Sequence, residues 1–127
     1  MPGIVRDKLA DAADAFCETV ACNAEQTRRY LKAAKDLGLK LHLHADQLTD
    51  GAGGELAASL GAFSADHLEY CSEASAQAMA KAGTVATLLP GAFYCLQEPQ
   101  APPVHWFRQH RVPMEVDTDC NPGTSPV

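Results

Sequence analysis

The segment from Leu39 to His44 alternates apolar and polar residues. Leu39, Leu41 and Leu43 fall on one side of an extended chain, and Lys40, His42 and His44 fall on the other. This period of two is the signature of a β-strand. His44 comes at the carboxyl end of the predicted strand, where parallel α/β folds bind their ligands. His44 is therefore a candidate site residue, and the alternative is a hydrogen-bonded histidine that only closes the strand.

Periodicity and capping residues predict the other elements. Asn23 and Gln26 form the capping box of a helix that runs to Gly38, and Ser72 caps a later helix that Gly83 closes. The expected strands are 13–17, 39–44, 63–67, 84–89 and 112–118, and further helices are expected at 55–60, 73–82 and 103–110. A helical lead-in that reaches Leu9 and residue 13 precedes the first strand. The glycine-rich segment 49–54 lacks the spacing and the lysine of a P-loop, so it is expected to be a turn, and 97–103 is expected to be a loop.

The strands and helices alternate, which implies parallel strands joined by right-handed helical crossovers. The common hosts of this rhythm are a doubly wound sheet and a (β/α)8 barrel. No G-x-G-x-x-G follows the first strand, so a nucleotide-binding fold has little support. The predicted fold class is α/β, as part of a (β/α)8 barrel.

Composition narrows the functional classes. The chain has 127 residues, enough for one domain, and its formal charge of −6 argues against nucleic acid and anionic membranes as partners. The five cysteines follow neither a disulfide framework nor a zinc ribbon, so we expect reduced thiols. The sequence shows neither a signal-peptide apolar region near Met1 nor a run long enough to span a membrane. We therefore expect a cytoplasmic protein.

Chemically competent side chains follow three of the predicted strands. They are His44, then Asp66 and His67, then Asp119. In a barrel these strand ends converge, and imidazole and carboxylate groups could share a divalent metal, with zinc or iron(II) preferred by such ligands. That chemistry suits hydrolysis of an amide-like or amidine-like bond.

Simpler interpretations exist for each of these residues. Asp119 could be a turn residue before Asn-Pro-Gly, and Asp66 and His67 could form a local hydrogen-bonded pair. Other histidines in the chain are expected to have no ligand role. They are His42, which lies short of the strand end, and the helix residues His105 and His110, which are expected at the surface.

Four motifs stand in register along the chain. They are HADQL at 44–48, SADHLE at 64–69, LLPGAFY at 88–94 and TDCNPGT at 118–124. In order and spacing they resemble the imidazolonepropionases of histidine degradation, a family of the amidohydrolase superfamily of metal-dependent (β/α)8 barrels. The likeness runs from about Leu9 to the end. It implies hydrolytic opening of the ring of 4-imidazolone-5-propanoate, a small-molecule substrate, to N-formimidoyl-L-glutamate.

The resemblance also implies roles for individual residues. His44 and Asp119 match the ligands of one zinc or iron ion, and Asp119 is counted with His67 as catalytic. His67 matches a histidine expected to orient the substrate carbonyl and the attacking water. The matching substrate-contact positions are Gln47, Asn121, Gly123 and Thr124.

The chain also departs from the family pattern. The His-x-His metal pair of the first barrel strand is absent, since His42-Leu43-His44 lies on the strand that the motifs match to the fifth. We therefore expect residues 1–127 to form a partial barrel domain, roughly strands 4 to 8, that lacks the N-terminal strands and the final helices and is inactive alone. By resemblance the intact enzyme is expected to form a homodimer. Two alternatives are a heterocycle deaminase that uses His44, His67 and Asp119, and a non-catalytic half-barrel that acts by association.

Overall fold

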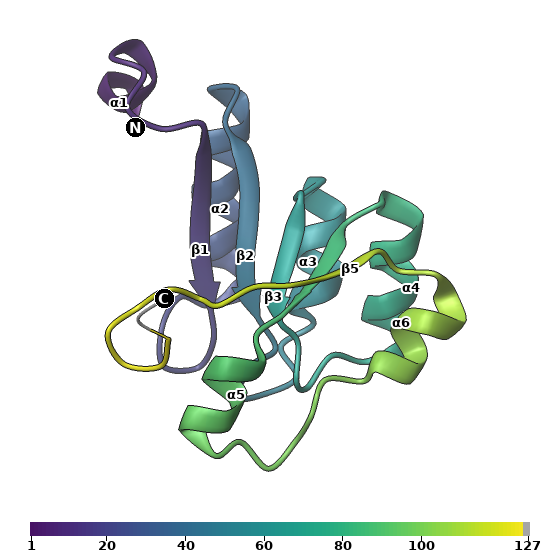
Figure 1. Ribbon diagram of the computed structural model, residues 1–127. Coiled ribbons are helices and arrows are strands. Elements are labelled where there is room, and N and C mark those ends of the chain that lie inside the picture. The colour runs from purple at the N-terminus through teal and green to yellow at the C-terminus, as the bar shows by residue number, and fades with distance from the viewer. Residues whose placement is uncertain (126–127) are drawn as a thin grey trace.

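A computed structural model describes residues 1–125, and its centre is a five-stranded parallel sheet (Figure 1). The strands are β1 (Ala12–Cys17), β2 (Lys40–Ala45), β3 (Ser64–His67), β4 (Val85–Leu88) and β5 (Met114–Val116). Their order in the sheet is their order in the sequence, and every neighbouring pair is parallel. Consecutive strands of a (β/α) barrel have this arrangement. The predicted α/β class and parallel sheet are confirmed.

Helix α1 (Pro2–Arg6) precedes the first strand, and the other helices connect the strands. They are α2 (Ala24–Asp36), α3 (Gly53–Leu60), α4 (Glu73–Ala82), α5 (Pro90–Leu96) and α6 (Val104–His110). Figure 1 shows α2, α3 and α4 on one side of the sheet. The predicted capping box of α2 is present, because Asn23 Oδ1 accepts from the Gln26 N–H at 2.9 Å and Gln26 Oε1 accepts from the Asn23 N–H at 3.0 Å. Among residues 1–125, no helix has the length and apolar character needed to cross a membrane.

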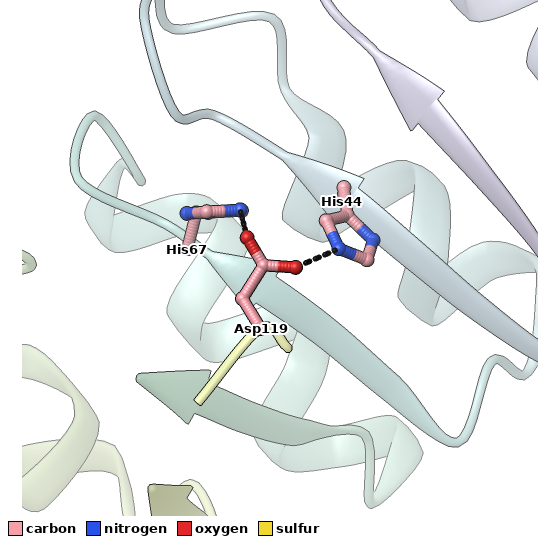
Figure 2. A group of neighbouring side chains, drawn as sticks. All are labelled: His44, His67 and Asp119. Carbon is pink, nitrogen blue, oxygen red and sulfur yellow. Dashed lines mark hydrogen bonds and ion pairs between the residues drawn. The ribbon is translucent and has the colours of Figure 1, made fainter. Parts of the chain in front are cut away.

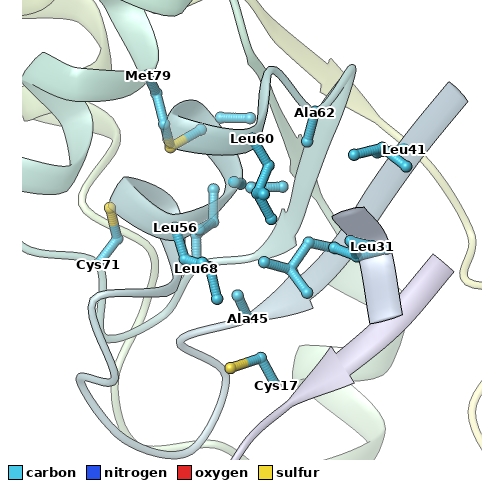
Figure 3. Packing of buried hydrophobic residues seen from close by; sticks show 14 of the residues in the cluster. Cys17, Leu31, Leu41, Ala45, Leu56, Leu60, Ala62, Leu68, Cys71 and Met79 are labelled. Atoms are coloured by element: carbon cyan, nitrogen blue, oxygen red, sulfur yellow. The ribbon is translucent and has the colours of Figure 1, made fainter. Parts of the chain in front are cut away.

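The apolar core lies between the sheet and this helix layer (Figure 3). Leu41, Leu43 and Ala45 of β2 are all buried and meet helix residues such as Leu31 and Leu56. Burial of every second residue confirms the alternation predicted for this strand. The side chains that alternate with these residues along β2 lie on the other face of the sheet, outside this core.

The opposite face of the sheet is polar. The strand register places Asp14 beside His42 and His44 beside Asp66 on this face, and Thr87 of β4 continues the row. Because a carboxylate, an imidazole or a hydroxyl recurs on each of these four strands, this face is not built as a second apolar core. We call it the polar face.

Two predicted helix boundaries were wrong. The lead-in helix ends at Arg6, before Leu9, because Lys8 has a left-handed backbone with φ of 52°. Helix α3 begins at Gly53, because the Asp46 carboxylate accepts hydrogen bonds from the Gly53 and Gly54 N–H groups. A Cβ at Gly53 would strike the Cβ of Ala45, so only glycine fits there.

The region around β4 and β5 also differs from the prediction. Pro90 was expected only to end a strand, but it occupies the first turn of α5, where its missing N–H is not needed. The last strand covers only Met114–Val116, and all three of its residues are exposed. This edge of the sheet is therefore shorter than its sequence pattern suggested.

Candidate metal and active site

Three of the predicted site residues meet at the carboxyl end of the sheet. The Asp119 carboxylate lies between two imidazoles, with Oδ1 3.4 Å from His44 Nε2 and Oδ2 3.7 Å from His67 Nε2 (Figure 2). The three side chains line an open hollow of about 360 Å³, together with Asp14 and Gln47. Residues 75 positions apart are thus brought together by the parallel sheet, as the strand-end argument predicted.

His67 reaches the hollow because of its backbone. Its register partner Ala45 points into the buried core, so a regular strand would send the imidazole the same way. His67 and Leu68 instead have left-handed φ values of 76° and 67°, which redirect the chain at this point. Such conformations cost on the order of 1–3 kcal/mol for non-glycine residues and concentrate at functional sites.

Asp119 is placed by a tight turn after β5. Its own φ is 52°, and the Asn121 amide nitrogen donates to the Asp119 carbonyl at 2.6 Å and to Thr124 Oγ1 at 2.7 Å. Asn121 Oδ1 accepts from the N–H groups of Gly123 and Thr124 at 2.8 and 3.0 Å. The Asn121 amide is therefore engaged within the turn. Asn121, Gly123 and Thr124 lie outside the lining of the hollow, and their predicted contact with substrate stays a prediction.

Gln47 lies on the loop after β2, and Glu18 holds that loop in place. Glu18 Oε1 accepts from the N–H groups of Leu48 and Thr49 at 2.8 and 3.1 Å, and its Oε2 accepts from Thr49 Oγ1 at 2.8 Å. Burial opposes ionisation of Glu18, but these hydrogen bonds outweigh it and lower its pKa. The sequence did not predict this role of Glu18, because a hydrogen bond over 30 residues leaves no local pattern.

The two site histidines have opposite protonation preferences. The hydrogen bond from His44 Nδ1 to Asp14, at 2.9 Å, is the main cause that raises the pKa of His44 to about 9. Burial, followed by the charge on His44, lowers the pKa of His67 to about 4. Near pH 7 His44 therefore carries a proton that a bound cation would displace, and His67 is neutral.

The donor set fits a divalent metal. One ligand atom from each of His44, His67 and Asp119 lies within 4.8 Å of the others. Two ligands of a tetrahedral zinc ion are about 3.4 Å apart, from bonds of about 2.1 Å. The His44–Asp119 separation of 3.4 Å matches this spacing, and nitrogen and oxygen donors suit zinc or iron. The family resemblance gave His67 a catalytic role only, whereas its Nε2 belongs to the same cluster as the two matched metal ligands.

Other polar residues have simpler roles. His42 Nδ1 is 2.8 Å from Ser64 Oγ, which donates to Asp66 Oδ1 at 2.7 Å, and His42 is absent from the metal-competent groups found in residues 1–125. His105 is exposed, as predicted. The surface prediction for His110 was wrong, because its side chain is only 19% exposed and its Nε2 is 2.9 Å from Glu73.

Fold and site together define a class of protein. Parallel strands with helical crossovers, and nitrogen and oxygen donors gathered at the carboxyl ends, are features of metal-dependent (β/α) barrels. Two solved structures share this fold. An adenosine deaminase from Xanthomonas campestris with bound zinc has a TM-score of 0.65 and 18% identity over 90% of this chain and 29% of its own. An amidohydrolase from a Sargasso Sea sample has a TM-score of 0.60 and 17% identity over 84% of this chain and 24% of its own.

Curated sequences narrow the class further. The whole chain aligns with proteins named imidazolonepropionase from Mesorhizobium japonicum, Methylobacterium sp. and Shewanella amazonensis, at 59%, 58% and 56% identity. It spans only 31–32% of the length of these relatives. No family model matches the chain. The resemblance to part of an imidazolonepropionase, inferred from the four motifs, is confirmed.

Proposed function

We propose that this chain is part of a metal-dependent hydrolase that opens the ring of 4-imidazolone-5-propanoate to N-formimidoyl-L-glutamate. The observation that carries the proposal is the convergence of His44, His67 and Asp119 on one hollow. The name imidazolonepropionase, which relatives more than half identical to this chain carry, supports this choice of reaction. The proposed substrate is small, which suits an open hollow of about 360 Å³.

His44 and Asp119 would hold one zinc or iron ion. Bound there, the metal would supply Lewis-acid polarisation of an oxygen group. His67 Nε2 lies 3.7 Å from Asp119 Oδ2, beside the proposed metal position. The chain spans about a third of its relatives, so further ligands are proposed to come from the rest of such a protein.

The chain's own residues then account for proton movement. The net reaction adds one water across a ring C–N bond, with the hydroxyl joining the carbonyl carbon and a proton joining the departing nitrogen. His67 is neutral near pH 7, because its pKa is about 4, so a ring nitrogen can accept a hydrogen bond from the attacking water. The Asp119 carboxylate beside it can receive the water proton and return it to the nitrogen.

Substrate orientation is assigned to two loops. Gln47 lines the hollow with an amide that can both donate to and accept from the polar edge of an imidazolone ring. The turn with Asn121, Gly123 and Thr124 is proposed to meet the propionate-bearing end. Since the side chain of Asn121 is engaged in the turn, its first role is to hold Asp119 and the turn backbone in place.

A graft would test the function in a complete protein. Residues 1–127 would replace the matching segment of the Mesorhizobium japonicum imidazolonepropionase, and we refer to this protein as the graft. We expect the graft to form N-formimidoyl-L-glutamate, and His67→Gln to lower kcat by about 10²–10⁴-fold. Exposed His105, changed to Gln, is the matched control and should leave kcat unchanged.

Two outcomes would overturn the proposal. A folded graft that leaves the imidazolone intact would contradict the reaction. Release of ammonia from an aminated heterocycle, without N-formimidoyl-L-glutamate, would point instead to a deaminase. We expect residues 1–127 alone to be inactive in the same assay.

A further inference from the structure

Asp14 contacts the proposed metal ligand His44 on the side away from Asp119. Asp14 Oδ2 is 2.9 Å from His44 Nδ1, while Nε2 of the same ring faces Asp119. The other oxygen, Oδ1, accepts from the Ala15 N–H at 2.7 Å. The carboxylate is thus held by the backbone of β1 at one oxygen and holds the imidazole with the other.

A second carboxylate, Asp66, is a weaker partner for the same nitrogen. Its Oδ2 lies 3.5 Å from His44 Nδ1, beyond a good hydrogen bond, and its Oδ1 already accepts from Ser64 Oγ at 2.7 Å. Asp66 and His44 are register partners on adjacent strands, so the polar face brings both carboxylates to one ring. The distances assign the hydrogen bond to Asp14.

We propose that Asp14 is a positioning residue, which keeps Nδ1 of His44 as the N–H donor and leaves Nε2 to bind the metal. This inference rests on the proposed function and adds a residue that the motif comparison did not mark. A histidine ligand must present one nitrogen and protonate the other, and its hydrogen-bond partner decides which. Loss of such a partner typically weakens metal binding by about 10–100-fold.

The test uses the 127-residue chain, with ¹⁵N-labelled histidine, in two measurements. The first follows solvent exchange of the His44 Nδ1 proton by NMR in metal-free protein. The second titrates the chain with zinc and follows the ¹⁵N signals of His44. The variants are Asp14→Asn, Asp14→Ala and Asp66→Asn, and Asp11→Asn, an exposed aspartate next to the same strand, is the matched control. Circular dichroism confirms that each variant is folded.

We expect a protected Nδ1 proton and Nε2 as the zinc-bound nitrogen in the parent chain, in Asp66→Asn and in Asp11→Asn. Asp14→Ala should expose the proton, allow zinc at either nitrogen and weaken zinc binding by 10–100-fold. Asp14→Asn keeps a neutral acceptor, so it should lose less. Partial rescue by Asn would not follow if Asp14 served only to shape the strand.

The outcomes separate the inference from the function. If Asp14→Ala leaves both the Nδ1 proton and zinc affinity as in Asp11→Asn, the positioning role is wrong while the metal site stands. If the Nδ1 proton depends on Asp14 but zinc engages His44 neither in the parent chain nor in the graft, the proposed metal site fails, and with it the role of Asp14 toward the metal.

Discussion

The two faces of strand β2 have opposite environments, because one is apolar and buried and the other is polar and half-buried. On the helix side, Leu41, Leu43 and Ala45 are at most 2% exposed and belong to the apolar core. On the polar face, the neighbours His42 and His44 are half-buried and bonded to Ser64 and Asp14. One face of this strand therefore serves stability and the other places His44 at the candidate site, so substitutions on the two faces should affect different measurements.

The largest expected effect on folding comes from the helix side. Leu43→Ala removes a fully buried side chain, and such truncations lower the free energy of unfolding by about 2–5 kcal/mol. The matched variant on the polar face, His42→Ala, removes one hydrogen bond and should cost about 1 kcal/mol. Urea unfolding measures both. Equal losses for the two variants would contradict the division of labour between the faces.

Glu18 is buried directly after β1 and holds the loop that carries Gln47, so it contributes both to stability and to the candidate site. Its pKa is lowered in the folded protein, so its stabilising effect is present above its unfolded value of 4.5 and is lost as pH falls through the folded pKa. Glu18→Gln should lower stability by about 2 kcal/mol at pH 7. In urea titrations, the gap between the two proteins should close on acidification. A gap that stays constant with pH would show that the Glu18 charge is not involved.

A substitution at Asn121 has the smallest expected effect on stability, and this effect is confined to the turn after Asp119. Asn121→Ala removes the hydrogen bonds that hold the turn after Asp119, at a cost of about 1 kcal/mol. The Gly123 and Thr124 amide protons should then exchange faster with solvent, while those of β2 do not change. Thr118→Ala, at an exposed position beside the turn, is the control. Unchanged exchange at Gly123 would mean that the turn does not depend on Asn121.

The sequence predicted the elements whose signals are local. The capping box at Asn23 and the alternation from Leu39 to His44 each lie within a few residues, and both are present in the structure. The convergence of His44 and Asp119 was also predictable, because parallel strands place their carboxyl ends at one edge. This prediction came from the general geometry of parallel α/β folds and needed no local sequence pattern.

Features that depend on distant contacts were missed. Asp14 looked like an ordinary strand residue, since its bond to His44 crosses between strands. The orientation of His67 depends on a left-handed backbone that no residue type announces, because His67 and Leu68 are not glycines. Helix α3 starts early for a similar reason, as the Asp46 carboxylate reaches forward to Gly53. Asp14 of β1 shares a sheet face with His42 of β2 only because of a strand register that the sequence does not reveal.

The metal content of the purified graft shows whether His44 and Asp119 hold a metal ion. Elemental analysis would compare the parent graft with His44→Ala, Asp119→Ala and the polar-face control His42→Ala. We expect about one zinc or iron per chain in the parent and the control, and loss of the metal in the other two. A metal content that is unaffected by His44→Ala and Asp119→Ala would contradict the proposed metal site, because the strand-end histidine and aspartate would then be structural.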